Sequence, residues 1–324
     1  MNTNNINAHI GAWLQQGVTT YERRNQRGIR MSWLTLLMKC LSVAGLLALL
    51  AGVYVLLIRP TQLTLGAGAA ELRQAMPGDA IPVIATFDAT RAVTIAGTPE
   101  QIWPWLVQWG YGRAGFYGYD VIENLASPSG LRSADRIIPQ WQHLAIGDRI
   151  LMNDLAYFTV SDISPNQFMV LTGSANPPAT TSVMTWALYR IDQGHTRLVN
   201  RFRFQHTGTP MLMALNLFTD FADPIAINKI MLGVQARVEG HVEPLGIQVA
   251  EVAAWLLIFV ELIVATVLIF AWRTWGWAWL IGLFIGLALL FALFSPLLVW
   301  FKLLLGVGIL ASLVGSRHWI RRAL

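Results

Sequence analysis

Residues 90–125, TRAVTIAGTPEQIWPWLVQWGYGRAGFYGYDVIENL, decide the fold. They contain GYGRAG at 110–115, a literal G-x-G-x-x-G, which in dinucleotide-binding enzymes follows a strand and opens a helix. The flanks differ from that order. Thr98 and Gln101 form a Thr-x-x-Gln capping box around Pro99, so a helix enters the glycines, and the strand-like residues 91–95 end before that helix. We therefore interpret the glycines as a tight loop between this helix and a second one over 119–126.

The composition of the whole chain is that of a membrane protein. Of its 324 residues, 55% are hydrophobic and 13% charged, and the apolar residues are concentrated at the two ends. Residues 32–58 and 249–271 are each long enough to cross a bilayer core, which takes ~20 helical residues. A longer apolar run is broken at Ser295-Pro296, which predicts helices over 276–294 and 297–315. We expect about four spans, a polar N-terminal tail over 1–31 and a basic tail over 316–324.

The orientation follows from arginines close to the spans, since these residues stay preferentially on the cytoplasmic side. They lie before the first span, between the second and third, and after the last: Arg23, Arg24, Arg27, Arg30, Arg273, Arg317, Arg321 and Arg322. Four spans place all of them on one side, whereas three spans would place the last cluster outside. A cleavable signal peptide is disfavoured, because its basic region would be about thirty residues long. We expect both termini in the cytoplasm and residues 59–248 outside it.

Several classes of function are disfavoured by the residues present. The net charge of +5 reflects the arginines near the spans, and no basic run alternates with aromatic residues as in a nucleic-acid groove. The single cysteine, Cys40, lies in the first span and cannot form a disulfide within the chain. The six histidines lack metal-ligand spacing, so we expect no metal and no cofactor.

Residues 59–248 have the size of one domain. Five segments of strand character follow the two helices, at 146–151, 156–163, 167–172, 182–191 and 196–204. Short links between them predict an antiparallel sheet. A segment of helical periodicity follows at 210–238, with an expected kink at Asp223-Pro224. The order of strand, two helices, five strands and long helix is that of the helix-grip fold.

Five stretches carry a family resemblance: residues 90–125, SADRIIPQWQHLAIGDRI at 133–150, TWALYRI at 185–191, HTRLVNRFRF at 195–204 and KIMLGVQARVEG at 229–240. Together they resemble the START-like (SRPBCC) superfamily, in its bacterial polyketide-cyclase-like branch, over about 85–240. The resemblance implies an α+β helix-grip domain, in which an antiparallel sheet wraps a long C-terminal helix around an internal cavity for lipids, sterols, polyketides or other apolar molecules. The superfamily contains both binders and enzymes, so fold alone does not choose between them.

The candidate ligand-binding residues are aromatic and polar side chains of these stretches and apolar side chains of the long helix: Trp105, Gln108, Arg113, Tyr117, Asp120, Trp141, Trp186, Leu215 and Phe218. A further polar set comprises Glu123, Asp135, Arg136, Gln142 and Asp148. The polar residues form either a head-group or acid–base site, or a buried network, which we favour, with Arg113 paired to Asp120 or Asp135. The aromatic residues either line the cavity or belong to the core.

Two groups of charged residues need a separate explanation. Strand periodicity places Arg197, Arg201 and Arg203 on one face of the last strand, where we expect solvent; the alternative is a grip on a phosphate or carboxylate. Lys39, Glu261 and Lys302 lie inside predicted spans, where ionisable groups are costly. We expect both lysines to extend towards head groups, and Glu261 to be paired with a lysine, protonated, or in contact with another subunit.

Three functions follow. The first is a membrane-held domain that binds or transfers an apolar or amphipathic molecule of the lipid or isoprenoid class, beside the long-helix stripe Met211, Leu215, Phe218 and Ile225. The second is a cyclase-type enzyme using the same cavity, although the sequence shows no Ser-His-Asp or Cys-His arrangement and we name no catalytic residue. The third is an accessory subunit of a membrane complex without a ligand, in which Glu261 and the Gly282/Gly286 pair mark helix contacts.

Overall fold

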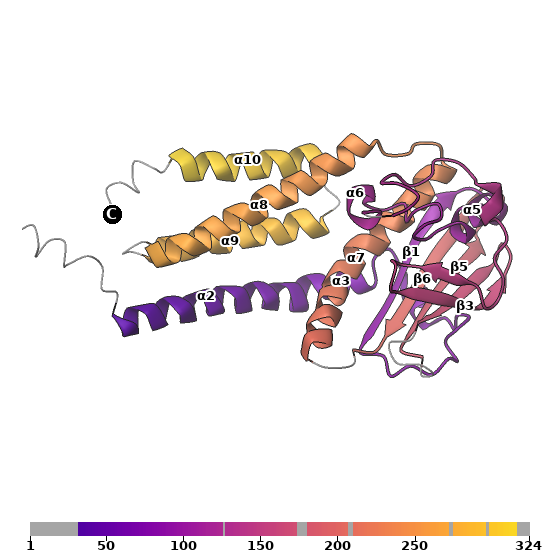
Figure 1. Cartoon of the computed structure of the whole chain (residues 1–324), viewed down its shortest axis with the longest axis horizontal. Coiled ribbons are helices and arrows are strands. Elements are labelled where there is room, and N and C mark those ends of the chain that lie inside the picture. The colour runs from indigo at the N-terminus through magenta and orange to yellow at the C-terminus, as the bar shows by residue number, and fades with distance from the viewer. Residues whose placement is uncertain are drawn as a thin grey trace, which may run out of the picture.

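The computed structural model describes residues 32–125, 127–173, 180–206, 210–271, 275–295 and 298–315, with the side chains of 210–216 and 313–315 excepted. An α+β domain forms one end of the molecule, and apolar helices extend from it (Figure 1). Three of the described helices, Trp33–Leu63, Leu245–Ala271 and Trp275–Phe294, are long and apolar enough to cross a membrane. The predicted tails at 1–31 and 316–324 lie outside the described residues.

The domain is built on one antiparallel sheet of six strands in the order β1-β6-β5-β4-β3-β2. The strands are β1 (Phe87–Ala96), β2 (Arg149–Leu151), β3 (Tyr157–Ser164), β4 (Phe168–Gly173), β5 (Ser182–Arg190) and β6 (His195–Phe204). β1 is longer than predicted, because it pairs with β6 along its whole length. β2 is shorter, because Gly147 (φ 94°) and Asp148 form a turn in which the Asp148 carboxylate accepts from the Ala145 N–H at 2.8 Å.

The predicted glycine loop follows α5 (Pro99–Val107), whose capping box is present: the Thr98 N–H donates to Gln101 Oε1 at 2.8 Å. Gly110, Gly112 and Gly115 all have positive φ angles, and Gly110 and Gly115 form an antiparallel bridge that closes the loop. The second helix, α6 (Asp120–Glu123), is shorter than the predicted 119–126. A helix thus enters these glycines, which excludes the strand–turn–helix context of a dinucleotide site.

The long helix α7 (Pro210–Val238) has the predicted bounds and continues through Pro224. It packs on β1 and α5, and Ile227, Ile230, Met231 and Val234 are buried in the main core cluster of the domain. At Gly233 the helix comes so close to the Tyr117 carbonyl that a Cβ atom has no room. α7 therefore covers one face of the sheet, and in Figure 1 it runs across the ends of the apolar helices.

The other face of the sheet is covered by the chain between the first apolar helix and β1, including α4 (Ala69–Arg73). Arg197 pairs with Glu71 at 2.7 Å, and Arg201, which is 8% exposed, pairs with Asp79 at 2.6 Å. Arg203 donates to the Gly78 carbonyl at 2.8 Å. The expectation that these arginines face solvent was wrong: strand periodicity assigns side chains to a face but does not reveal what covers that face.

The first apolar helix runs without interruption from α2 (Trp33–Val53) through the π-helical η1 (Tyr54–Ile58) and α3 (Arg59–Leu63), five residues beyond the predicted end at 58. The others are α8 (Leu245–Ala271), α9 (Trp275–Phe294) and the shorter α10 (Val299–Gly315). α8 contacts each of the other three. α2 and α9 run towards the domain, whereas α8 and α10 start beside it and run away (Figure 1).

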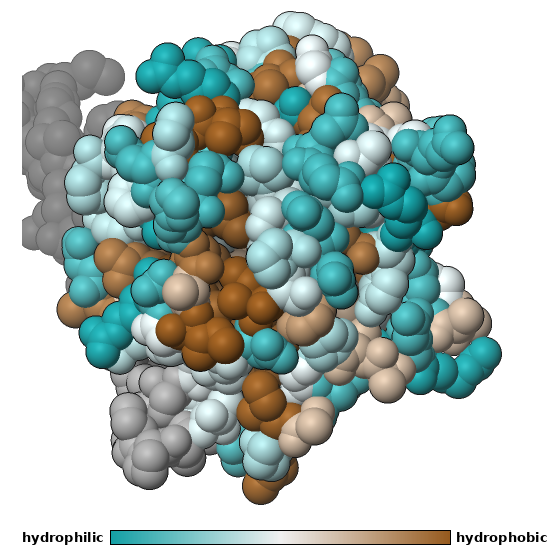
Figure 2. Space-filling model, turned by 90° about the vertical axis from the view of Figure 1, so that its right-hand side faces the viewer, coloured by the Kyte–Doolittle hydropathy of each residue, from teal (hydrophilic) through white to brown (hydrophobic). Residues whose placement is uncertain are grey.

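Small residues let α9 approach α2 within this bundle. Gly282 faces Leu46, and Gly286 faces Leu50 so closely that a Cβ atom there would force the Leu50 side chain to shift. The predicted Gly282/Gly286 contact is therefore made inside the chain. The outer face of the α+β domain, turned away from the apolar helices, is mainly hydrophilic with smaller apolar patches (Figure 2).

Candidate functional site

A cavity of about 550 Å³ lies where the α+β domain meets the apolar helices. Its domain-side wall comes from α7 and from Tyr119, which precedes α6, and its other wall from α3, α8, the end of α9 and the start of α10. The lining includes Gln62, Tyr119, Ile225, Asn228, Lys229, Leu232, Glu243, Ile247, Glu251, Phe294, Leu298, Trp300 and Lys302. This volume and mixture of apolar and polar side chains are typical of sites for small organic molecules.

One stripe of α7 faces this cavity. Ile225, Asn228, Lys229 and Leu232 follow the spacing i, i+3, i+4, i+7, so they share one side of the helix. Phe218, seven residues before Ile225, belongs to the same side and is 65% exposed. The side chains of Met211 and Leu215 lie outside the described residues. Phe218 and Ile225, the described side chains of the predicted ligand stripe, thus face away from the sheet, because the sheet contacts the stripe of Ile227, Ile230, Met231 and Val234.

Four charged side chains form a chain of alternating sign along the cavity wall. The Lys229 ammonium lies 2.8 Å from the Glu243 carboxylate and 3.2 Å from that of Glu251, whose other oxygen pairs with Lys302. The exposed fractions of the side chains of Glu243, Lys229, Glu251 and Lys302 are 35%, 17%, 10% and 3%. The chain of charges therefore leads from an accessible edge into the interior. Lys302 does not extend to a head group as expected, because a carboxylate on α8 is within its reach.

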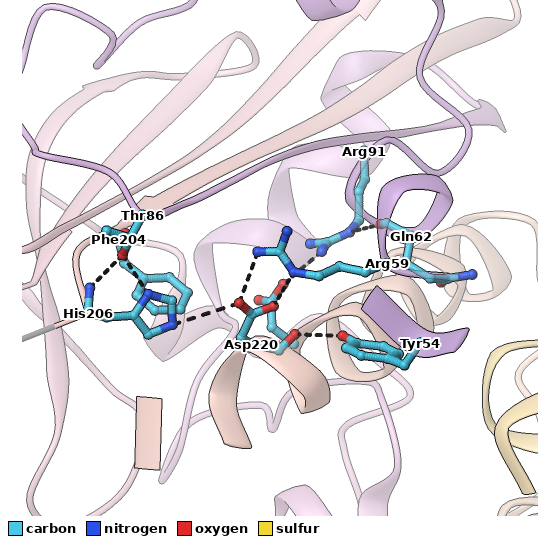
Figure 3. Close-up of polar contacts among 9 residues, drawn as sticks. Tyr54, Arg59, Gln62, Thr86, Arg91, Phe204, His206 and Asp220 are labelled. Carbon is cyan, nitrogen blue, oxygen red and sulfur yellow. Dashed lines mark hydrogen bonds and ion pairs between the residues drawn. The ribbon is translucent and has the colours of Figure 1, made fainter. Parts of the chain in front are cut away.

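A second network fixes the position of α7 against the end of the first apolar helix (Figure 3). Arg59 donates two hydrogen bonds of 2.9 Å to the Asp220 carboxylate. Arg91 on β1 is 1% exposed, pairs with Asp223 at 2.8 Å and donates to the Gln62 carbonyl at 2.8 Å. Since Gln62 lines the cavity and Asp223 precedes the lining residue Pro224, this network holds two of its walls in register.

The short helix α6 attaches the glycine loop to α8. The Asp120 N–H donates to Gln248 Oε1 at 2.9 Å, and the Asp120 carboxylate accepts from Ser133 and Asn124. The Tyr119 ring packs against Trp255 with 4.8 Å between centroids, and Lys229 lies 4.8 Å from the same ring. Burial, and then the neighbouring Glu251 carboxylate, raise the pKa of the Tyr119 hydroxyl well above its ordinary range, so it stays a neutral donor.

Glu123, at the end of α6, has both carboxyl oxygens buried. Burial raises its pKa to about 7, and the nearby Asp120 charge acts in the same direction. The backbone amides of Tyr119 and Gly118 and the Lys229 charge oppose the shift. Glu123 therefore changes its charge near neutral pH, close to the cavity but outside its lining.

The predicted aromatic candidates lie in the core of the domain. Trp105, Tyr117 and Trp186 are 8%, 2% and 1% exposed. The Tyr117 hydroxyl donates to the Trp105 carbonyl at 3.1 Å, and burial raises its pKa. Trp141 is partly exposed, with the Arg113 guanidinium 4.5 Å from the centre of its ring.

Arg113 does not pair with Asp120 or Asp135. It donates to the carbonyls of Val107 at 2.8 Å and Trp141 at 3.1 Å. Val107 ends α5, and carbonyls at a helix C-terminus lack helical partners, so they attract a guanidinium. Burial lowers the pKa of Arg113 from its ordinary value.

The other predicted polar residues divide into buried and exposed groups. Gln108 is fully buried, accepts from the Ile138 N–H at 2.8 Å and from Gln142 at 3.1 Å, and donates to the Arg136 carbonyl at 3.1 Å. The side chains of Asp135, Arg136 and Asp148 belong to exposed residues. The buried network therefore consists of amides and of Asp120 with its hydroxyl and amide partners.

The remaining charges of the apolar helices differ in their contacts. Lys39 is 4% exposed and donates to the Phe270 carbonyl at 2.7 Å, so it does not extend to a head group. Glu261 is 2% exposed, and its carboxyl oxygens have no hydrogen-bond partner among the described residues. The described lysine contacts thus leave Glu261 without a cation partner. Within the described part of the chain, no three His, Cys, Asp or Glu side chains could hold a metal ion.

Sequence reasoning missed Lys229, Glu243 and Glu251. Glu251 carried a usable signal, because it lies two residues inside the predicted span 249–271 and could be compared with Lys302 as an intramembrane charge. Lys229 and Glu243 carried none, since charged residues outside the predicted spans are normally solvated.

No family model and no curated protein matches the chain. Among solved structures, the chain is similar to protein MLL2253 from Mesorhizobium loti, with 18% identity over 46% of this chain and 96% of that chain and a TM-score of 0.27. The Aha1 dimer from Colwellia psychrerythraea matches with 15% identity over 48% and 98% and a TM-score of 0.29. The KanY protein matches with 10% identity over 47% and 97% and a TM-score of 0.29. With TM-scores this low, these likenesses carry no argument about family or function.

Proposed function

We propose that this protein is a membrane-anchored START-like domain that binds or transfers an amphipathic small molecule of the lipid class. The cavity between α7 and the apolar helices carries the proposal, because a protein domain and membrane-type helices share its walls. Leu232, Ile247 and Leu298 offer apolar contacts, and the row of lysines and glutamates offers polar ones. A ligand can reach such a site from the bilayer without crossing water.

The proposal includes a helix-grip domain and a membrane region of four spans. The α+β domain has the helix-grip arrangement, supported by the packing of α7 on β1 and α5. The membrane region has four spans, with α10 as the fourth; its 17 residues extend about 25 Å as a helix, close to the thickness of a bilayer core. The alternating directions of α2, α8, α9 and α10 support this number (Figure 1).

Residues 59–248 then lie outside the cytoplasmic membrane of a bacterium, and both termini lie inside. The arginine clusters beside the spans support this orientation. A Ser129→Cys substitution in a Cys40→Ser background tests it with an impermeant maleimide. We expect labelling in sealed cells; labelling that requires permeabilised membranes would overturn the orientation.

Ligand binding is tested by filling the cavity. Ile247→Trp adds volume to a lining position of α8, and Val249→Trp places the same side chain two residues along, at a 45% exposed position outside the lining. Native mass spectrometry of the purified full-length protein measures bound lipid, and a thermal melt follows on the same sample. We expect lipid on the wild type and on Val249→Trp, and its loss from Ile247→Trp with little change in melting temperature.

Absence of lipid from the wild type would contradict the proposal and favour an accessory subunit without a ligand. Equal lipid on both tryptophan variants would show that the ligand sits elsewhere, for example on the outside of the helices.

A further inference from the structure

The four charges along the cavity wall sum to zero, with two ammonium groups from Lys229 and Lys302 and two carboxylates from Glu243 and Glu251. Each lysine has a carboxylate partner and each carboxylate has a lysine partner. A ligand meets a neutral wall with local charges of both signs in alternation. Its head group must be compatible with that pattern, because a charge moved from water into a partly buried site needs a partner there.

We infer that the ligand of this cavity has a net-neutral, zwitterionic head group that combines a phosphate with an amine, as in an aminophospholipid. The inference rests on the proposed function and assigns the chemical class of its ligand. The ligand phosphate pairs with Lys229 and the ligand amine pairs with Glu243. The Lys229–Glu243 ion pair is thus replaced by two ion pairs with the ligand. An anionic head group would instead leave an excess negative charge beside Glu243 and Glu251.

The burial of the four charges determines which ion pair opens for the ligand. Glu243 and Lys229 form the accessible end, whereas Lys302 is 3% exposed and held by Glu251. Partly exposed ion pairs are weak in water, so the Lys229–Glu243 pair opens at the smallest cost. The buried Lys302–Glu251 pair stays closed, because opening it would leave two charges without partners in the interior.

Space for a head group lies on both sides of this pair. Lys229, Leu232 and Glu243 line the main cavity and also a second one of about 220 Å³, which Tyr117, Arg237 and His241 complete. The Lys229–Glu243 pair thus stands in a wall common to both cavities. On the main side, the Asn228 amide lies in the lining and makes no hydrogen bond to any residue in the described part of the chain, so it is available to the ligand.

The test uses the full-length protein in bilayers of equal phosphatidylethanolamine and phosphatidylglycerol with the same acyl chains. Native mass spectrometry after transfer to detergent measures the ratio of the two lipids on the protein. At pH 6 Glu123, whose pKa is about 7, is largely protonated and adds little charge near Lys229. We expect the wild type to retain the zwitterionic lipid in about tenfold excess over phosphatidylglycerol. This is the ratio that one additional favourable charge contact would produce.

Two variants change the charge of the wall in opposite directions. Glu243→Gln leaves it with one net positive charge, so the ratio should shift about tenfold towards phosphatidylglycerol. Lys229→Gln leaves it with one net negative charge and should shift the ratio the other way, with less lipid in total. Glu100→Gln is the control, because Glu100 lies in an exposed pair with Arg190 and should leave the ratio unchanged.

The outcomes separate this inference from the proposed function. Phosphatidylglycerol enriched on the wild type, or a ratio that neither charge variant moves, would overturn the zwitterionic head group while lipid binding stands. No lipid on any variant would overturn the proposed function itself. Melting temperatures of the same samples verify folding, and the opposite shifts expected for the two variants cannot both arise from a common loss of stability.

Discussion

The two sides of α7 carry stripes of side chains with the same residue spacing, but one stripe is buried in the core and the other lines a cavity. Towards the sheet, Ile227, Ile230, Met231 and Val234 are at most 4% exposed and pack in the main core. On the other side, a stripe with the same intervals, beginning at Ile225, lines the cavity with asparagine and lysine among its members. The comparison teaches that periodicity alone places side chains, whereas their chemistry decides whether a face is filled during folding or left for a ligand.

The packing on the sheet side explains why the candidate cavity does not lie between the sheet and α7. Trp186 is 1% exposed and makes an edge contact of 6.0 Å with Trp109, so large aromatic side chains occupy the space between sheet and helix. The family resemblance implied an internal cavity at that place. In the structure the candidate cavity described above lies on the opposite side of α7, against the apolar helices.

The largest effect is expected from the charge on the sheet side of α7. Asp223 lies four residues before Ile227 on that side and is paired with Arg91, with side chains 6% and 1% exposed. Arg91→Met leaves a buried carboxylate without its partner, so we expect the free energy of unfolding to fall by about 3 to 5 kcal/mol. Chemical denaturation in detergent measures it.

The matched control is Arg190→Met, which removes a pair whose side chains are 47% and 57% exposed. Its effect should be far smaller than that of Arg91→Met, since exposed pairs contribute little. Similar losses for the two variants would mean that Asp223 is as well solvated as Glu100 and that the sheet side of α7 is open.

A smaller effect separates two neighbouring residues of α7. Met231 is 2% exposed on the sheet side, and Leu232 is 44% exposed on the cavity side. Met231→Ala leaves a void in the core and should lower the free energy of unfolding by about 2 to 5 kcal/mol, whereas Leu232→Ala should cost less than about 1 kcal/mol. Leu232→Ala should instead reduce retained lipid. A reversed order of the two stabilities would assign the faces of α7 the other way round.

Much of the fold could be predicted because local signals determine it. The Thr98–Gln101 capping box starts α5 as expected, and the helical periodicity over 210–238 gives the bounds of α7. Alternation and turn residues located the strands, and composition located the apolar helices. These signals act over a few residues and need no knowledge of the neighbours in space.

The candidate site could not be predicted in the same way, because its charges meet across the fold. Lys229 and Glu251 are 22 residues apart, and Glu251 and Lys302 are 51 apart, on three different helices. The arginines of β6 likewise find Glu71 and Asp79 more than 120 residues away. A single sequence indicates that a charge needs a partner, but the partner is chosen by packing.

The smallest effect concerns Glu123, whose carboxyl group feels the charge of Lys229 on the cavity side of α7. Burial raises its pKa from 4.5 to about 7 in the folded protein, so the folded state binds its proton more tightly than the unfolded state. The stability that Glu123 contributes is therefore complete below pH 4.5 and is lost as the pH rises towards 7. Since one pKa unit corresponds to about 1.4 kcal/mol, the loss at pH 8 is up to about 3 kcal/mol. Glu123→Gln removes the titration, so the variant should melt higher than the wild type at pH 8 and match it near pH 4.5.

The control is Glu100→Gln, which changes an exposed carboxylate and should show no such gain in melting temperature at pH 8. Equal melting curves of Glu123→Gln and wild type across this range would mean that the Glu123 carboxylate is solvated, and that the cavity side of α7 is open to water as far as α6.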